Sequence, residues 1–218
     1  MWQEIIPDNL WIHENFLTTP MLESILSKIE TVEAIPKDSH TAVPYKGLTN
    51  YRYSFVNYDF KQDDLLVNEV LDKLNLLYEP LLGMKADRSK LNVNAFWAKI
   101  FEPDSNIEMH VETVGTYGPV IFLLYLSDEV DGALNLPDET TARKKFWSDG
   151  FQEIYDSFAV KFVGPYRFIP RKNTCIVMRV DCAHLVEPCS GLRPTLQGWS
   201  FNSATFGGKS HNPDALPD

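Results

Sequence analysis

The sequence predicts an α+β protein whose mainly β core, a barrel or jelly roll, is flanked by N-terminal helices. Hydrophobic residues recur at a helical period in the first ninety residues, and the period changes to two after Asp87. Turn signals such as Asp131-Gly132 and Gly164-Pro165 separate several short strand candidates. Helices confined to the front of a series of short strands are typical of a barrel or jelly roll with a helical cover.

The length predicts a single domain. The chain has 218 residues and a mass of 24.9 kDa, which allows a sizeable core but is short for two independent folds. We expect one domain over residues 1–218, in which 1–90 form helical support and a long loop, 91–206 form the jelly-roll core and 207–218 form a frayed tail.

Two segments near the start have the pattern of amphipathic helices. In residues 19–32 the apolar residues recur at steps of three and four, behind a threonine cap and a first-turn proline. In residues 62–82 the same period repeats until Pro80 and Gly83 end it. Residues 34–59 between them are rich in Pro, Tyr, Asn and Gly, which predicts a long loop with one short strand at most.

A period of two marks the strands of the second half. In residues 91–100 the apolar positions alternate with Asn92, Asn94 and Lys99, which predicts a strand; the apolar positions are Leu91, Val93, Ala95, Trp97 and Ile100. The other strand candidates are residues 120–126, 157–163, 166–169, 174–180 and 195–201. Residues 139–155 mix charges with aromatic side chains, so we expect an inserted loop or short helix near the mouth of the barrel.

Composition and charge exclude several classes of protein. The apolar fraction of 44%, the charged fraction of 23% and the aromatic fraction of 12% are ordinary for globular proteins, which excludes disordered, collagen-like and coiled-coil chains. The formal net charge of −10 opposes binding to nucleic acid and to anionic membranes, and no apolar run approaches the roughly 18 residues of a membrane span. We expect neither a nucleic-acid nor a membrane partner.

The start of the chain and its cysteines favour a cytoplasmic protein. The first ten residues lack the basic segment followed by an apolar segment that marks a secretory signal. Three cysteines, Cys175, Cys182 and Cys189, form no C-x-x-C pair, so neither a disulfide framework nor a zinc knuckle is expected.

Two histidines and a glutamate are the candidates for a metal site. We expect His110 at the start of a strand, and in the segment His110-Val111-Glu112 an extended backbone directs the imidazole and the carboxylate to the same face. His184 on a neighbouring strand would complete the two-histidine, one-carboxylate set that leaves open positions on non-haem Fe(II). The alternative is a surface glutamate beside a packed histidine. The other histidines lie in loop or terminal contexts, where we expect solvated side chains; they are His13, His40 and His211.

The segment that follows His184 resembles a known family. After His184 come Pro188, a turn with glycine, Arg193 and Thr195 two residues later, and then an aromatic strand with Trp199. This order is similar to the C-terminal half of the Fe(II)- and 2-oxoglutarate-dependent dioxygenases, most of all to their prolyl-4-hydroxylase-like branch.

Other segments fit the same resemblance, which spans residues 91–201. Phe101-Glu102-Pro103-Asp104 stands nine residues before His110, as a Tyr-Glu-Pro-Gly turn does in that branch. Tyr125-Leu126-Ser127-Asp128 and Asp131-Gly132-Ala133-Leu134 resemble its Tyr-Leu-Ser-Asp and Gly-Gly strand pair.

The resemblance implies a double-stranded β-helix, with Fe(II), 2-oxoglutarate as cosubstrate and O2. His110, Glu112 and His184 would be the metal-binding and catalytic residues. A planar guanidinium suits a carboxylate, so Arg193 is the candidate for the 5-carboxylate of 2-oxoglutarate. Thr195, on the same face of the strand, and Tyr125 would donate further hydrogen bonds to it.

Two positions depart from the family. The usual aspartate is Glu112, one methylene longer, and the tyrosine that helps to hold 2-oxoglutarate is Phe101, so that contact is lost or supplied elsewhere, with Tyr125 as a candidate. A related halogenase branch has Gly or Ala in place of the carboxylate, so Glu112 argues against that chemistry.

The predicted activity is hydroxylation of an unactivated C–H bond with release of succinate and CO2. The substrate is either a prolyl or other peptidyl residue, or a free amino acid or other small metabolite. Three aromatic residues are candidates to line the substrate-binding site: Trp199, Trp97 and Tyr117. Core packing explains Trp199 equally well. Asp181 is either a partner for a ligand imidazole or a solvated residue in a turn.

The alternative function is a catalytically inactive, cupin-like binding or structural domain. Demethylation of a nucleic-acid base is disfavoured by the net charge.

Overall fold

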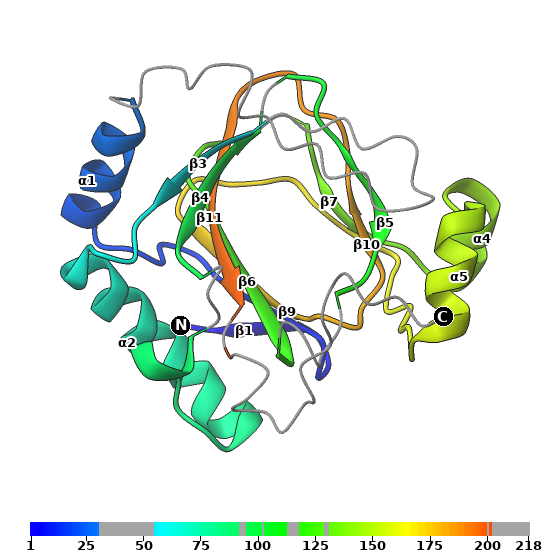
Figure 1. The fold of residues 1–218 in the computed structure, drawn as a ribbon, viewed down its shortest axis with the longest axis horizontal. Coiled ribbons are helices and arrows are strands. Elements are labelled where there is room, and N and C mark those ends of the chain that lie inside the picture. The colour runs from blue at the N-terminus through cyan, green and yellow to red at the C-terminus, as the bar shows by residue number, and fades with distance from the viewer. Residues whose placement is uncertain are drawn as a thin grey trace.

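The computed structural model is a barrel of two antiparallel sheets that face each other, with helices on both sides (Figure 1). It describes residues 1–30, 55–91, 95–101, 103–112, 118–128, 131–199 and 201. The seven-stranded sheet has the order β1 (Gln3–Ile6), β2 (Leu10–His13), β9 (Thr174–Arg179), β6 (Val120–Tyr125), β11 (Arg193–Trp199), β4 (Trp97–Phe101) and β3 (Phe55–Asp59). The four-stranded sheet has the order β5 (Ile107–His110), β10 (His184–Val186), β7 (Leu134–Leu136) and β8 (Tyr166–Phe168).

From β4 onward the chain passes back and forth between the two sheets, which is the winding of a jelly roll. The predicted α+β fold class with a mainly β core is therefore confirmed. The first ninety residues provide more than helices, because β1, β2 and β3 extend the larger sheet at its two edges.

Two helices cover the outer face of the larger sheet, on the left in Figure 1. They are α1 (Thr19–Glu30) and α2 (Asp64–Leu82), and they confirm the two helical segments expected from the sequence. The Asp63 side chain caps α2 by accepting a hydrogen bond from the Leu66 N–H, and α2 ends at Gly83, whose φ of 66° suits glycine.

Both faces of the larger sheet are buried, and alternate side chains of β11 point to opposite faces. Leu196 packs outward against the core that α1 and α2 cover, whereas Trp199 packs between the two sheets. Gly198 also faces outward, where a Cβ atom would lie 2.6 Å from the Cα atom of Ala95. Glycine is therefore required for the close approach of these two backbone segments.

The other helix pair covers the smaller sheet. Residues 139–155 were expected to be a loop or one short helix; the structure has two, α4 (Glu139–Lys145) and α5 (Asp149–Ser157). Phe151 of α5 packs on Met109 and Leu185 of the smaller sheet. The strand predicted over residues 157–163 is wrong, because Ser157 ends α5 and only Lys161 forms an isolated bridge, with Cys182. The helical cap at Ser148 and the buried Phe151 outweigh the local alternation.

Several boundaries differ from the sequence expectation. His110 is the last residue of β5 rather than the first residue of a strand, and β11 begins at Arg193, two residues earlier than predicted. Residues 92–94, 200 and 202–218 lie outside the described residues, as do His40 and His211.

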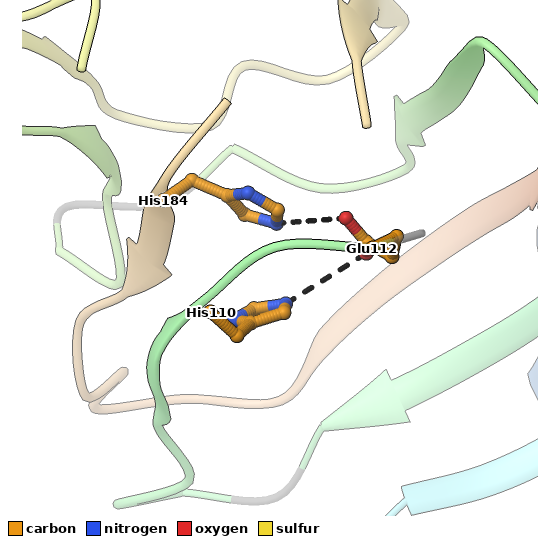
Figure 2. Close-up of side chains that lie close together, drawn as sticks. All are labelled: His110, Glu112 and His184. Atoms are coloured by element: carbon orange, nitrogen blue, oxygen red, sulfur yellow. Dashed lines mark ion pairs between the residues drawn. The ribbon is translucent and has the colours of Figure 1, made fainter. Parts of the chain in front are cut away.

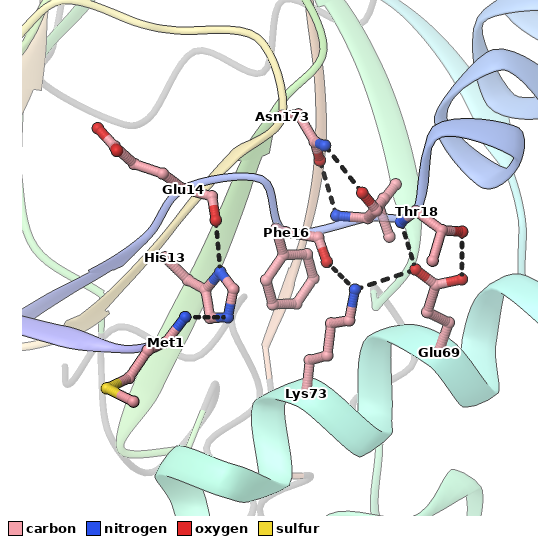
Figure 3. A network of polar contacts seen from close by, with 9 residues as sticks. Met1, His13, Glu14, Phe16, Thr18, Glu69, Lys73 and Asn173 are labelled. Atoms are coloured by element: carbon pink, nitrogen blue, oxygen red, sulfur yellow. Dashed lines mark hydrogen bonds and ion pairs between the residues drawn. The ribbon is translucent and has the colours of Figure 1, made fainter.

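A polar network joins the connection before α1 to α2 and to the start of β9 (Figure 3). The Asn173 side chain accepts from the Leu17 N–H at 2.7 Å and donates to the Leu17 carbonyl at 2.9 Å. Glu69 of α2 accepts from the N–H and the hydroxyl of Thr18, and Lys73 donates to Glu69 and to the Phe16 carbonyl. These bonds fix the helical cover against the sheet.

His13 differs from its expectation as a solvated loop residue. It lies on β2, where its imidazole contacts the Met1 amine at 3.0 Å and the Glu14 carbonyl at 2.8 Å (Figure 3). Burial lowers its pKa. In the part of the chain that the structure describes, no helix is both long and apolar enough to cross a membrane.

Replacement of the α2 cap tests the packing of the helical cover. We expect Asp63→Ala to lower the free energy of unfolding by about 1 kcal/mol, the usual value for a lost N-cap. Asp63→Asn keeps a capping group but loses the ion pair with Lys28. The side-chain hydrogen bond from Lys28 and the Leu66 N–H lower the pKa of Asp63, so this charge stabilises the fold above the ordinary pKa of the carboxyl.

That stabilisation is lost as the pH falls through the lowered pKa of folded Asp63. Urea unfolding should therefore give a higher free energy of unfolding for the wild type than for Asp63→Asn at about pH 7. This difference should disappear towards about pH 2. A difference independent of pH would contradict the role given to the ion pair.

Candidate metal centre

Two imidazoles and one carboxylate converge inside the barrel (Figure 2). His110 at the end of β5 is the antiparallel partner of His184 at the start of β10, and their ring centroids are 4.2 Å apart. Glu112 follows β5, and its backbone N–H donates to the Val180 carbonyl at 2.9 Å. One ligand atom from each of the three side chains lies within 4.8 Å of the other two.

The orientation of both imidazoles is set by backbone carbonyls. His110 Nδ1 lies 2.7 Å from the Glu108 carbonyl oxygen, and His184 Nδ1 lies 2.9 Å from that of Cys182. Because a carbonyl oxygen only accepts, Nδ1 carries the hydrogen and Nε2 of the neutral ring presents a lone pair. The Nε2 atoms face the Glu112 carboxylate at 3.7 Å from His110 and 3.8 Å from His184.

Burial keeps these imidazoles neutral. It lowers the pKa of His184 to about 4, and burial together with the neighbouring His184 lowers the pKa of His110 to about 4. A neutral imidazole is the form that binds a metal. Asp181, a candidate partner for a ligand imidazole, instead pairs with Lys161 at 2.8 Å.

The donor set fits a divalent cation. Burial raises the pKa of Glu112, and its Oε2 atom is buried without a hydrogen-bond partner among the described residues. A buried carboxylate oxygen without a partner is costly, and a bound cation removes that cost. Two neutral imidazoles and one carboxylate are ligands that suit non-haem Fe(II).

A buried arginine lies on the larger sheet, which faces the smaller sheet that carries the two histidines. Arg193 on β11 is 1% exposed, its Nη1 atom donates to the Gly132 carbonyl at 2.6 Å, and its guanidinium lies 4.6 Å from the centre of the Phe101 ring. A Cβ atom at Gly132 would lie 2.8 Å from that Nη1, and the φ of Gly132 is 66°, so glycine is required beside the guanidinium. No carboxylate forms an ion pair with Arg193 among the described residues.

Two further predicted residues lie beside Arg193 on the same face. Thr195 and Tyr125 are directly opposite each other on β11 and β6. The Thr195 Oγ1 atom is buried with no hydrogen-bond partner among the described residues, and burial raises the pKa of Tyr125, which keeps its hydroxyl protonated as a donor. A cation and two hydroxyl groups therefore gather where an anion would satisfy all three.

The three aromatic candidates for the substrate border have different surroundings. Trp199 lies on the same face of β11 as Arg193 and packs in the core between the sheets. Trp97 is opposite Gln197 of β11, with the Lys61 Nζ atom 5.4 Å from its ring centre. Tyr117 lies outside the described residues.

Lys99 is a charged residue on the inner face of the larger sheet that the sequence did not predict. Ala98 faces the helical cover, and Lys99 is directly opposite Thr195 on the inner face. An uninterrupted period of two would put Leu91 and Ala95 on the face of Lys99, but both pack in the same core as Ala98, because the positive φ of 61° at Phe96 interrupts the extended backbone before β4.

Comparison with solved structures identifies the fold. A 2-oxoglutarate-Fe(II) oxygenase from Burkholderia pseudomallei is similar, with 12% identity, a TM-score of 0.56 and coverage of 90% of this chain and 88% of the other. A Trichoplax adhaerens prolyl hydroxylase, solved with a peptide fragment of the hypoxia inducible factor oxygen degradation domain, has 11% identity, a TM-score of 0.53 and coverage of 94% and 89%. A non-haem α-ketoglutarate-dependent epimerase from nogalamycin biosynthesis has 12% identity, a TM-score of 0.56 and coverage of 89% and 79%.

No protein-family model and no curated protein sequence matches this chain. The likeness is therefore one of fold, the fold of the 2-oxoglutarate oxygenases, and it agrees with the double-stranded β-helix that the sequence resemblance implied.

Metal titration tests the three converging side chains. We expect one divalent ion per chain, and at least about 100-fold weaker binding after His110→Ala or His184→Ala, because even the loss of a group that orients a ligand costs 10- to 100-fold. Anaerobic calorimetry with Fe(II) measures the affinity, and His13→Ala is the matched control. Equal affinities in the wild type and in both variants would exclude this metal centre.

Proposed function

We propose that this protein is an Fe(II)- and 2-oxoglutarate-dependent oxygenase that hydroxylates an unactivated C–H bond and releases succinate and CO2. One observation carries the proposal: a buried arginine without an ion-pair partner among the described residues lies on the sheet that faces a two-histidine, one-carboxylate cluster. This combination suits a cosubstrate that chelates a metal at one end and carries a carboxylate at the other. The fold shared with 2-oxoglutarate oxygenases supports it.

His110, Glu112 and His184 would hold the iron from one side. The bound Fe(II), with 2-oxoglutarate and O2, would supply an oxidant strong enough to attack an unactivated C–H bond. The carbonyls of Glu108 and Cys182 keep both imidazoles in the tautomer with a free Nε2 lone pair. Their low pKa values keep them unprotonated at neutral pH, so no proton competes with the metal.

Arg193 would bind the 5-carboxylate of 2-oxoglutarate, with Thr195 and Tyr125 as hydroxyl donors. Gly132 and Phe101 hold the guanidinium in place, the first by its carbonyl and the second by the face of its ring. Tyr125 would supply the hydroxyl group that Phe101 lacks, because it is the strand partner of Thr195. Phe101 packs its ring against the Arg193 guanidinium but has no hydroxyl group.

The substrate is a prolyl or other peptidyl residue, or a free amino acid or other small metabolite. The Trichoplax adhaerens prolyl hydroxylase, solved with a peptide fragment, shares the fold, which supports a peptidyl substrate. The fold does not decide the reaction by itself, because an epimerase also shares it.

A catalytically inactive, cupin-like binding or structural domain is the second candidate. Two departures favour it, Glu112 in place of aspartate and Phe101 in place of tyrosine. The low pKa values of both histidines and the buried Oε2 atom of Glu112 support a metal-binding site instead. A domain without the activity would show neither succinate formation nor metal-dependent stabilisation by 2-oxoglutarate.

Variants of the arginine site test the cosubstrate assignment. We expect Arg193→Met to weaken 2-oxoglutarate binding at least about 30-fold, because truncation of one partner of a buried charge pair costs about 2 kcal/mol or more. Gly132→Ala should weaken it in the same direction, since its Cβ atom would displace the guanidinium. The affinity is measured anaerobically with Fe(II), from the charge-transfer absorption that 2-oxoglutarate produces.

Arg171→Met is the matched control, because Arg171 is 71% exposed. Substrate-dependent succinate formation should fall with the affinity in both site variants, while Fe(II) binding stays at the wild-type level. Wild-type protein that binds Fe(II) but gives no 2-oxoglutarate response would favour the inactive domain.

A further inference from the structure

Asp131 directly precedes the glycine that holds the Arg193 guanidinium. The Gly132 carbonyl accepts from the Arg193 Nη1 atom at 2.6 Å, and within the described ranges this is the one hydrogen bond that the guanidinium makes. The direction of the guanidinium therefore depends on where this single carbonyl oxygen lies. The position of Gly132 depends in turn on the residues that fasten its segment to the rest of the molecule.

Two hydrogen bonds fasten the segment before β7 to the connection between β10 and β11. The Asp131 Oδ1 atom accepts from the Ser190 N–H at 2.9 Å, and the Glu187 N–H donates to the Ala133 carbonyl at 2.9 Å. Hydrogen bonds from the Ser190 backbone and hydroxyl lower the pKa of Asp131, so its carboxylate is ionised at neutral pH. One of the two bonds is therefore a hydrogen bond to a charged group, which is the stronger kind.

The same connection leads straight into Arg193, so both partners of the guanidinium bond are held by the contact between Asp131 and Ser190. Ser190 is exposed, and Leu192 is 61% exposed, so apolar packing contributes little to this part of the turn. Hydrogen bonds have correspondingly more weight there. The loss of the Asp131 carboxylate would leave the Gly132 carbonyl less firmly placed.

The Asp131 carboxylate is close in sequence to Arg193's partner but does not pair with Arg193 itself. Its oxygen is bound by Ser190, and no ion pair joins it to the guanidinium among the described residues. A guanidinium has five N–H groups, and the Gly132 carbonyl uses one of them. Ser190 therefore keeps this carboxylate from competing with a bound anion.

We infer that Asp131 is a positioning residue for the cosubstrate: by binding Ser190 it holds the Gly132 carbonyl where that carbonyl directs the Arg193 guanidinium at the 5-carboxylate of 2-oxoglutarate. The inference rests on the proposed function and adds a residue to its cosubstrate site. Without the Asp131 carboxylate, cosubstrate binding would have to order this segment first, and that cost lowers the affinity. The metal ligands would be unaffected.

A pair of 2-oxo acids separates this role from a general structural one. The probes are 2-oxoglutarate and 2-oxopentanoate, which has a methyl group in place of the 5-carboxylate, and their affinities are measured anaerobically with the Fe(II)-loaded protein. Both acids present the same chelating end to the metal, so the ratio of their affinities reports on the guanidinium contact. We expect Asp131→Ala to lower this ratio about 10-fold, because a hydrogen bond to a charged group has about that value.

Asp131→Asn is the control for charge. It removes the same negative charge as Asp131→Ala but keeps an oxygen that accepts from the Ser190 N–H, so it should keep at least the wild-type ratio. Both variants should bind Fe(II) and 2-oxopentanoate with wild-type affinity.

Asp128→Ala is the matched structural control. Asp128 is an exposed residue of the same connection between β6 and β7, and its Oδ1 atom accepts from the Lys172 N–H at 2.9 Å. This variant therefore loses the same kind of bond but leaves the turn before Arg193 intact. Urea unfolding should show a similar loss of stability for Asp128→Ala and Asp131→Ala, whereas only Asp131→Ala should lower the affinity ratio.

Four results would overturn the inference: Asp131→Ala keeps the wild-type ratio, Asp131→Asn lowers it as much, Asp128→Ala lowers it as much, or Asp131→Ala weakens the binding of both acids by the same factor. The last result would make Asp131 a structural residue only. Failure of the proposed function has a different sign, measured first on the wild type: no Fe(II)-dependent binding of 2-oxoglutarate, or equal affinities for the two acids. The role of Asp131 would then fall with it.

Discussion

The antiparallel pairing of His110 with His184 is the constraint on which the candidate site depends. These residues come from distant parts of the chain, and only the register between β5 and β10 brings their rings to 4.2 Å. A slip of one residue would turn one imidazole to the outer face, where Met109 and Leu185 meet α5. The apolar packing of α5 on that face therefore protects the register and the orientation of both imidazoles.

β11 carries residues of the candidate site that lie on the larger sheet. Its outward side chains, such as Leu196, are held by the core beneath α1 and α2, so its inward side chains have fixed positions. Arg193 and Thr195 lie in successive inward positions, and Tyr125 and Lys99 flank Thr195 on the neighbouring strands. The helical cover is thus remote from the chemistry but sets the geometry of the groups proposed to bind anions.

Side chains with strong local patterns were predictable, and those that depend on backbone irregularities were not. The His-x-Glu segment and the Arg-x-Thr segment each place two side chains on one face by the period of an extended chain, and the structure has them so. A period of two puts Lys99 on the face of Leu91 and Ala95, which pack beneath the helical cover, but the left-handed Phe96 changes the phase of the alternation and Lys99 faces inward. The short strands β5, β7 and β10 were missed as complete elements, because three or four residues are too few for a period to show.

By itself, the sequence determined the fold class, the two long helices and the identity of the residues that could hold a metal and an anion, because these follow from local periodicity and residue chemistry. The tertiary structure alone decided that His110, Glu112 and His184 converge and that Arg193 is buried without an ion-pair partner among the described residues. It also decided that Lys99 faces inward, opposite Thr195. Burial and distance depend on how remote segments pack, and the pKa values of the two histidines follow from that packing.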